Sequence, residues 1–162
     1  MNQVTQNIQK YGNNLVDYSN QNPPIDDLKN NYETLISTNW YLEIPVINVR
    51  AEIHEGTSKE VMNKFIAHFE ETKKTNGNIG LAAHNRGYEK NYFSDIKKLK
   101  EGDKIFYKYQ DFTKEYKVTS NFIIKDTDWT KLENTEDNRI TLITCVENQP
   151  GFRRCIQGEE VK

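Results

Sequence analysis

The sequence predicts a mainly β protein in which six or more short strands form an antiparallel barrel or sandwich with a few helices added. Three observations favour this fold class. Apolar and β-branched residues mark several short extended segments, turn residues separate those segments, and strands do not alternate regularly with helices as they do around a parallel sheet. The length of 162 residues fits one folded domain.

The first 38 residues differ in pattern from the rest. Apolar residues recur there at spacings of three and four, as in a helix, and Pro23 and Pro24 interrupt the pattern. The many polar residues in between favour a helical arm that packs on the domain or leads from an anchor upstream; a regulatory lid is the alternative. We therefore expect a helical arm over residues 1–38 and a folded domain over residues 39–162.

The strands of the folded domain begin near Trp40. An alternating segment over residues 40–53 contains Pro45, which suits an edge strand or a bulge. A turn is expected around Gly102, because glycine readily adopts a positive φ. Further strands are expected at residues 78–84, 104–109, 116–124, 139–145 and 153–157, with another turn at residues 110–113.

A helix is predicted over residues 58–69. Val61, Phe65 and Phe69 recur at helical spacing and would form one apolar face. Thr57 precedes this segment and can cap the helix with its side chain.

The composition excludes several classes of protein. The net charge is −2, from 22 basic and 24 acidic residues, so there is no broad cationic field to hold nucleic acid. No apolar run approaches the roughly 18 residues that a membrane-spanning helix needs. The chain as given is therefore expected to be soluble, with no nucleic-acid partner.

Cys145 is the first candidate for chemistry. It ends the β-branched, apolar run of residues 141–145, and the residues that follow do not easily continue a strand. A thiol there would lie half exposed at the rim of a sheet. The alternative is a small buried hydrophobic side chain, as free cysteine usually is. The second cysteine, Cys155, leaves open whether the pair forms a disulfide or two free thiols.

His84 has the most favourable context of the three histidines. It ends a predicted buried strand with small residues and is followed by Asn85 and a turn. His54 follows a strand among polar residues, and His68 lies on the predicted helix, where a surface or packing role is the ordinary expectation.

Cysteine, histidine and arginine at three strand ends would supply the groups for acyl transfer through a thiol. A thiolate attacks, an imidazole protonates the leaving amine, and a guanidinium holds the substrate carbonyls or the oxyanion. Arg153 and Arg154 begin the last strand, and at most one of them can share a face with the thiol. We expect no metal and no cofactor, because the chain has neither a zinc-binding pattern nor a phosphate-binding glycine loop.

The same residues resemble the signatures of the sortases, which are cysteine transpeptidases of Gram-positive bacteria. Residues 141–145 (TLITC) resemble the TLxTC signature, and residues 81–84 (LAAH) resemble the strand that ends in the family histidine. Residues 153–158 (RRCIQG) resemble the last strand, which opens with the family arginine. The resemblance covers about residues 39–161.

The resemblance implies an eight-stranded sortase-type β-barrel with short helices and a two-step reaction. Cys145 would attack a carbonyl of an LPxTG-like C-terminal sorting signal and form a thioacyl-enzyme. His84 would protonate the leaving amine, and Arg153, which matches the family arginine better than Arg154, would stabilise the oxyanion. The acceptor would be an amine of a cell-wall precursor or a pilin lysine. Substrate contacts would come from the neighbouring residues Thr144, Ala83 and Asn85.

Two departures, at Ala83 and Cys155, and one feature that bears on the class accompany the resemblance. Ala83 stands where many members have glycine, with a small expected effect. The short loop after Cys145 resembles class D more than class B. A disulfide between Cys145 and Cys155 would remove the nucleophile and is not expected, because the catalytic cysteine sits at the strand end.

The resemblance also leaves alternatives open. A catalytically silent module could bind sorting signals on the same barrel, and a thiol hydrolase could release the peptide to water. Sortases normally carry an N-terminal signal-anchor, and no such segment is expected within the chain as given. The expectation is a truncated form of an enzyme on the extracellular face of the cell membrane, with residues 1–38 as a membrane-proximal stalk; a soluble relative is the alternative.

Overall fold

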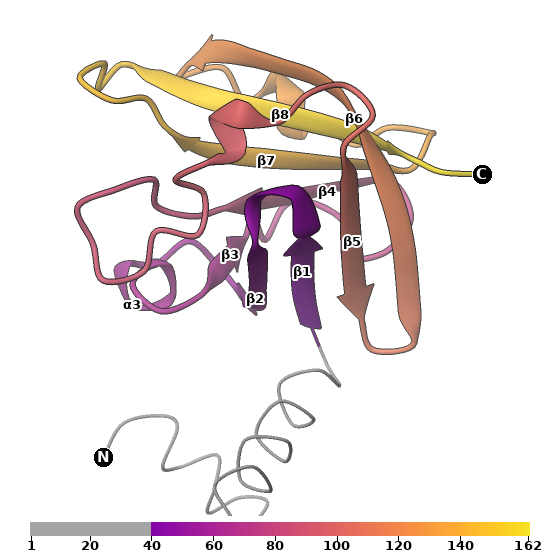
Figure 1. Cartoon of the computed structure of the whole chain (residues 1–162). Helices are drawn as coiled ribbons and strands as arrows, with labels where there is room; N and C mark the ends of the chain where they lie inside the picture. Colours follow the sequence, from indigo (N-terminus) through magenta and orange to yellow (C-terminus); the bar gives the residue numbers. More distant parts are fainter. Residues whose placement is uncertain (1–39) are drawn as a thin grey trace, which may run out of the picture. The chain divides into compact units, whose positions relative to one another are not determined.

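Eight strands close into a barrel within residues 40–162, the part of the chain that this computed structural model describes (Figure 1). The predicted arm over residues 1–38 lies outside the described residues. The strands are β1 (Trp40–Ile44), β2 (Val49–Glu55), β3 (Ile66–His68), β4 (Asn78–Ala82), β5 (Lys104–Tyr109), β6 (Phe112–Lys125), β7 (Arg139–Cys145) and β8 (Phe152–Glu160). The helical segments are η2 (Pro45–Ile47), α3 (Lys59–Met62), η3 (Ile96–Lys98) and η4 (Thr130–Leu132).

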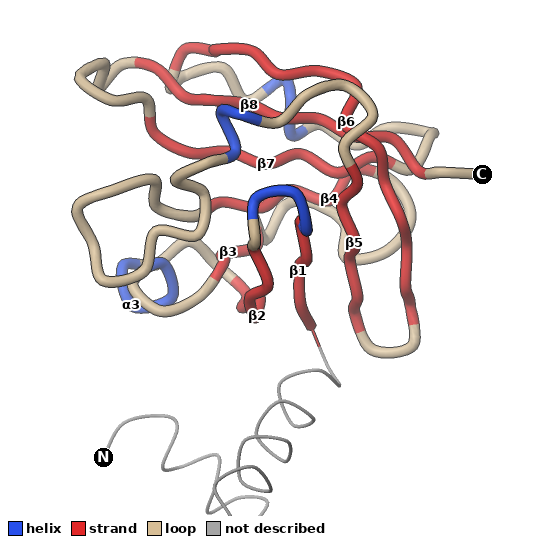
Figure 2. Tube along the Cα trace, viewed as in Figure 1, coloured by secondary structure: helices blue, strands red, loops and turns tan. Residues whose placement is uncertain are grey.

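The order of the strands around the barrel is β1-β2-β3-β4-β7-β8-β6-β5. Two neighbouring pairs, β2 with β3 and β4 with β7, are parallel, and the others are antiparallel. Figure 2 shows how strongly strand dominates over helix. Within residues 40–162, no helix has the length and apolar character needed to cross a membrane. The predicted mainly β, eight-stranded barrel is confirmed.

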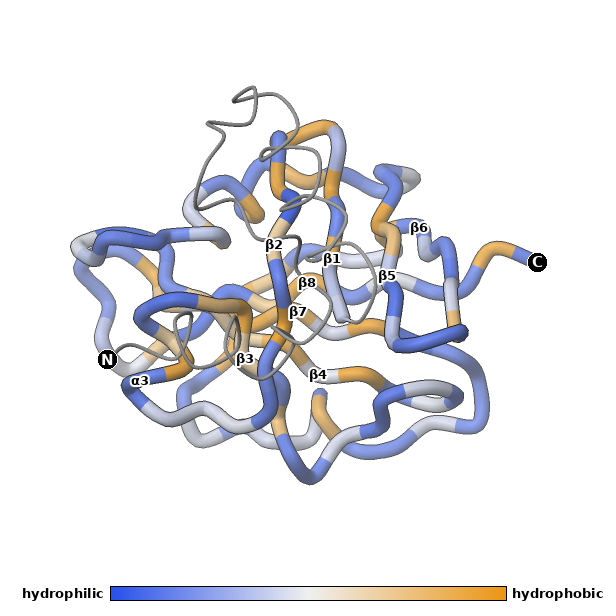
Figure 3. Tube along the Cα trace, turned by 90° about the horizontal axis from the view of Figure 1, so that it is seen from below, coloured by the Kyte–Doolittle hydropathy of each residue, from blue (hydrophilic) through white to orange (hydrophobic). Residues whose placement is uncertain are grey.

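The barrel interior holds one continuous apolar cluster. Its largest fully buried side chains are Tyr107, Tyr116 and Phe93. Along β7, Ile140 and Leu142 point into this cluster, because alternate residues of a strand face the same side. Figure 3 shows apolar segments along the central strands and polar residues in the surrounding connections.

A smaller apolar cluster lies on the opposite, outer face of β6, β7 and β8. Its buried members are Ile124, Ile143 and Cys155. Partly buried apolar side chains from β6 and from the connections after β3 and β6 pack against it: Phe69, Phe122 and Leu132. We call these six residues the outer cluster.

A buried polar row ties β4, β7 and β8 together near the other end of these strands. The Thr141 hydroxyl donates to Asn78 Oδ1 over 2.8 Å and accepts from Gln157 Nε2 over 3.2 Å. The Asn78 amide nitrogen also donates to the carbonyl oxygens of Lys131 and Glu133. Since buried polar groups are costly when unpaired, this row fixes the three strands and the β6–β7 connection to one another.

The predicted helix over residues 58–69 is wrong in its second half. The helix α3 ends at Met62, and Ser58 rather than Thr57 caps it. Ile66–His68 forms β3, which pairs with β2 on one side and β4 on the other. Pairing on both sides satisfies the backbone of β3 and buries its three side chains, so tertiary pairing overrides the helical pattern.

His68 is therefore a buried strand residue, and its role is packing. Its Nδ1 lies 2.6 Å from Glu55 Oε1, and its Nε2 lies 2.9 Å from the carbonyl oxygen of Lys73. Glu55 also forms an ion pair with Lys74. Burial raises the pKa of Glu55, but hydrogen bonds from Lys74 and His68 outweigh burial, so the pKa lies below its usual value.

Two smaller differences concern segment ends. Pro45 does not lie in an edge strand or a bulge; it begins η2, because its fixed φ suits the first helical position. β4 ends at Ala82, so His84 lies just beyond the strand that was expected to include it. The turn at Gly102 is confirmed, with a φ of 92°.

Gly80, in the middle of β4, provides a test of the packing beside the outer cluster. A Cβ at this position would lie 2.8 Å from side-chain atoms of Leu132 and Thr72 and 3.2 Å from Phe69. We expect Gly80→Ala to lower the free energy of unfolding by about 1–3 kcal/mol, because overpacking forces neighbouring side chains to shift. Urea unfolding followed by circular dichroism measures this change. Gly151→Ala is the matched control, since no described atom would lie within 4 Å of its Cβ; equal stability of both variants would contradict the prediction.

Candidate active site

Cys145 and Arg153 face each other at one rim of the barrel. Cys145 is the last residue of β7, and in the β7–β8 ladder it lies directly opposite Arg153. Residues directly opposite in an antiparallel pair project from the same face of the sheet. The Cys145 side chain is exposed, and Arg153 Nη1 donates to the carbonyl oxygens of Pro150 and Phe152 over 2.9 and 2.8 Å. Of the two arginines, Arg153 therefore shares the face of the thiol.

The parallel pairing of β4 with β7 brings His84 to the same rim. Ala82, the last residue of β4, pairs with Ile143 of β7. Beyond this pair, Ala83 and Asn85 on either side of His84 both form hydrogen bonds with residues at the end of β7, which brings His84 to the same rim as Cys145. Figure 1 shows β7 lying between β4 and β8, so the ends of β4 and β7 and the start of β8 meet at one place.

Three hydrogen bonds hold the chain after β4 against the end of β7. The Ala83 N–H donates to the carbonyl oxygen of Ile143 over 3.4 Å, and the Thr144 hydroxyl donates to the Ala83 carbonyl oxygen over 2.7 Å. Asn85 Nδ2 donates to the Cys145 carbonyl oxygen over 3.0 Å. The three residues expected beside the nucleophile and the histidine thus form the junction between the two strand ends.

The His84 imidazole is half-buried and lies face to face with the Tyr88 ring. The two ring centroids are 3.5 Å apart, and the ring planes differ by 5°. Burial lowers the pKa of His84 below its ordinary value. Its Nε2 atom is buried and has no hydrogen-bond partner within residues 40–162. A neutral imidazole with an unpaired ring nitrogen can exchange a proton with a bound molecule.

The two cysteines occupy contrasting environments. Cys145 is exposed, whereas Cys155 is buried in the outer cluster opposite Ile143. Burial raises the pKa of the Cys155 thiol to about 12. Both thiols are free in the described part of the chain, so Cys145 and Cys155 do not form a disulfide with each other.

A hollow of about 180 Å³ lies beside Cys145. Arg154 lines it and donates from Nη1 to Asn121 Oδ1 over 3.0 Å. Glu147 lines it too and forms an ion pair with Lys97 over 3.6 Å. Sequence patterns do not predict that these groups lie together, because they meet only when the β4–β5 connection and η3 fold over the rim. The remaining lining residues are Asn85, Phe93, Ser94, Thr144 and Val146.

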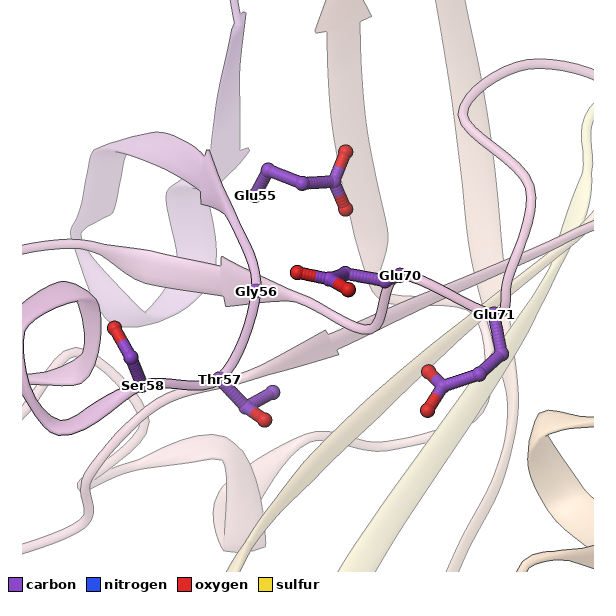
Figure 4. A pocket seen from close by; sticks show the side chains of 6 residues that line it. All are labelled: Glu55, Gly56, Thr57, Ser58, Glu70 and Glu71. Carbon is purple, nitrogen blue, oxygen red and sulfur yellow. The ribbon is translucent and has the colours of Figure 1, made fainter.

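A larger hollow of about 420 Å³ lies away from this rim, at the ends of β2 and β3 (Figure 4). Its acidic side chains are Glu55, Glu70 and Glu71, and Figure 4 shows the carboxylates of the latter two pointing in different directions. Within residues 40–162, no group of three or more histidine, cysteine or acidic side chains is arranged to hold a metal ion. The rim with Cys145 is the better candidate for chemistry, because the strand pairing brings a thiol and a guanidinium together there.

The fold and this rim define a class of protein. It is a closed eight-stranded β-barrel with a candidate cysteine nucleophile at one rim, where an imidazole and a guanidinium also lie. A family model described as a sortase domain matches residues 42–158. The chain is 32% identical over 110 residues to Sortase A of Staphylococcus aureus, covering 65% of this chain and 53% of that protein. It is 37% identical over 86 residues to Sortase A of Listeria monocytogenes, covering 53% and 39%. The chain belongs to the sortase family.

Solved structures share the same fold. Sortase A of Listeria monocytogenes has a TM-score of 0.70 and 30% identity, covering 78% of this chain and 88% of that one. A pilus-related Sortase C of Group B Streptococcus has a TM-score of 0.72 and 25% identity, covering 81% and 72%. The resemblance to sortases is thus confirmed, while the chain matches only about half the length, or less, of the curated relatives.

The two thiols provide a test of this geometry. We expect iodoacetamide to alkylate Cys145 in the folded protein at least ~100-fold faster than Cys155, because only a thiolate in contact with solvent reacts. With a pKa of about 12, the Cys155 thiolate is roughly one part in ten thousand at pH 8. Mass spectrometry of the digested protein measures both adducts. Cys145→Ala is the control and should give no adduct until the protein is unfolded; equal rates at both thiols would contradict the structure.

Proposed function

We propose that the folded domain is a sortase transpeptidase with Cys145 as nucleophile, His84 as proton carrier and Arg153 as oxyanion-stabilising residue. It cleaves an LPxTG-like C-terminal sorting signal and transfers the protein to an amine. Membership of the sortase family supports the reaction class. The meeting of these three residues at one rim is the observation that carries the assignment of roles.

In the first step, Cys145 attacks the carbonyl of the scissile amide. The thiol proton passes to His84, whose lowered pKa favours the neutral ring that can accept it. The thiolate sulfur bonds to the carbonyl carbon, and Arg153 stabilises the negative oxygen that results. His84 then gives its proton to the departing amine, and a thioester remains on Cys145.

In the second step, an incoming amine attacks the thioester carbonyl. His84 accepts a proton from the attacking nitrogen, the carbon–sulfur bond breaks, and a new amide forms; His84 then returns the proton to the released Cys145 thiolate. One amide is exchanged for another through a thioester of intermediate reactivity. The reaction therefore balances without a metal, a redox cofactor or a nucleotide.

The hydrogen bonding of Arg153 is compatible with this role. Its Nη1 donates to the carbonyl oxygens of Pro150 in the β7–β8 connection and of Phe152, the first residue of β8. A guanidinium has five N–H donors in a fixed plane, so the others remain for a substrate. The contacts with the connection hold the guanidinium near the start of β8, on the face of Cys145.

The outer cluster supports binding of the apolar residues of the signal. Ile143 and Cys145 alternate onto the same face of β7, so apolar surface begins one pleat away from the thiol. Trp129, which is 62% exposed, lies edge-on to Phe69 of this cluster. Exposed aromatic surface beside a buried apolar patch favours an apolar ligand.

Thr144 and Asn85 line the hollow beside Cys145, which supports our proposal that they contact substrate. Ala83 is buried, and both of its backbone polar groups are paired. This environment favours a role for Ala83 in placing His84.

The acceptor we propose is an amine of a cell-wall precursor. A pilin lysine is the alternative, favoured by the likeness to a pilus-related Sortase C. In this proposal the full-length protein acts on the extracellular face of the cell membrane, and residues 1–38 form a membrane-proximal stalk. The class D assignment stays a prediction from the short loop after Cys145.

A fluorogenic LPxTG-like peptide, with and without an added amine, tests the proposed function. We expect Cys145→Ala to abolish cleavage, and His84→Ala or Arg153→Ala to lower kcat/KM at least ~100-fold, because each removes a positioned acid or an oxyanion donor. Arg154→Ala separates the two arginines, since Arg154 lies on the opposite face of β8 but lines the hollow beside Cys145; a loss as large as that of Arg153→Ala would contradict the assignment of the oxyanion role to Arg153. Cys155→Ala should have a much milder effect.

Three outcomes would contradict the proposal. Full activity of the Cys145→Ala protein would exclude the thioacyl mechanism. Release of the peptide to water without transfer to any amine would indicate a hydrolase. Binding of the peptide without cleavage by the unaltered protein would indicate a module that only captures sorting signals.

A further inference from the structure

Tyr88 lies in the connection between β4 and β5, four residues after His84, and its side chain covers one face of the imidazole. The ring centroids are 3.5 Å apart and the planes nearly parallel, at 5°. Tyr88 is 51% exposed, so its ring adds little to a hydrophobic core. An exposed aromatic ring held this closely on a histidine at the candidate active site calls for a role other than core packing.

We propose that Tyr88 is a positioning residue, which holds the His84 imidazole at the end of β7 by stacking on it and keeps water from one face of the ring. The catalytic consequence of this role rests on the proposed function, whereas the stacking itself does not.

The backbone conformation around Tyr88 places the Tyr88 ring over His84. Gly87 has a φ of 79°, which glycine adopts without strain, and turns the chain back. The Asn91 side chain accepts from the Tyr88 N–H over 3.2 Å and donates to the Tyr88 carbonyl oxygen over 2.5 Å. The Phe93 N–H donates to the His84 carbonyl oxygen over 3.1 Å, which closes the loop. Local hydrogen bonds thus fix both partners of the stack.

Two further hydrogen bonds tie this loop to the chain around Cys145. Asn85 Nδ2 donates to the Cys145 carbonyl oxygen over 3.0 Å. Arg86 Nη2 donates to Asn148 Oδ1 in the β7–β8 connection over 3.2 Å. The pair of stacked rings is therefore held in a defined position relative to the end of β7.

The stack accounts for the environment of the imidazole. Burial is the cause of the lowered pKa of His84. The titratable or charged groups nearest in the fold are Cys145 and Arg153 on the neighbouring strands and Arg86 and Glu89 in the same loop. The phenol ring removes water from one imidazole face, which disfavours the charged form. Without that ring, the imidazole would be hydrated again, its pKa would rise, and its orientation would be less restricted.

The first experiment measures the stack directly. NMR titration of the His84 ring proton in the resting protein should show a higher midpoint in Tyr88→Ala, and an unchanged midpoint in Tyr88→Phe, which keeps the ring. The stack of His54 on Phe65, with centroids 3.6 Å apart, offers a matched control. Phe65→Ala removes that second stacked ring and should leave the titration of His84 unaltered.

The second experiment measures catalysis with the fluorogenic peptide. Tyr88→Ala should lower kcat about 10-fold, because misplacement of a catalytic group by a fraction of an ångström is costly, and change KM less than about 2-fold. Tyr88→Phe should retain the activity of the unaltered protein, and so should Lys90→Ala, which alters an exposed side chain of the same loop. Thermal unfolding confirms that each variant is folded.

The outcomes separate this proposal from the proposed function. If the unaltered protein cleaves no peptide but Tyr88→Ala shifts the His84 titration, the positioning role of Tyr88 stands and the proposed function fails. An unshifted titration in a folded Tyr88→Ala protein overturns the positioning role, whatever its activity. Equal loss of activity in Tyr88→Phe and Tyr88→Ala also overturns it, because the hydroxyl and not the stacked ring would then be required.

Discussion

The parallel pairing of β4 with β7 is the constraint on which the candidate active site depends. In an otherwise mostly antiparallel barrel, consecutive strands would send their ends to opposite rims. Because β4 and β7 run in the same direction, both of their carboxyl ends reach one rim, and antiparallel β8 begins there. The buried polar row of Asn78, Thr141 and Gln157 crosses the same three strands and opposes any slip in register, since a slip would leave these groups unpaired.

Most of the barrel could be predicted from local patterns, and the exception shows where such patterns fail. Short runs of apolar and β-branched residues located β5 and β7 at their observed bounds, because the side chains of these strands pack into the apolar clusters. Residues 66–68 were assigned to a helix, since three residues are too few to show alternation. Their strand exists only because β2 and β4 provide partners on both sides. The local sequence pattern does not show that β3 has strand partners on both sides.

The residues of the candidate site could be predicted because they lie at the ends of predicted strands. Cys145 and His84 each follow a buried apolar run, and the opposite facing of Arg153 and Arg154 follows from the pleat of a strand. The Tyr88 stack was not predictable, because it depends on a turn at Gly87 and a side-chain clamp within an irregular loop. Arg154 and the hollow it lines depend likewise on how the β4–β5 connection folds over the rim.

The three side chains of the site differ in how firmly the fold holds them, and this difference is compatible with their proposed roles. Cys145 and Arg153 belong to a strand ladder, so moving either one would disturb the whole sheet. His84 lies beyond the last pair of β4 and depends on a few partly exposed hydrogen bonds, each contributing about 0.5–1.5 kcal/mol, together with one stacked ring. A nucleophile and an oxyanion donor require fixed positions. A proton carrier must serve a leaving nitrogen and then an attacking one, so limited freedom in the loop, restrained by the aromatic ring, favours both transfers.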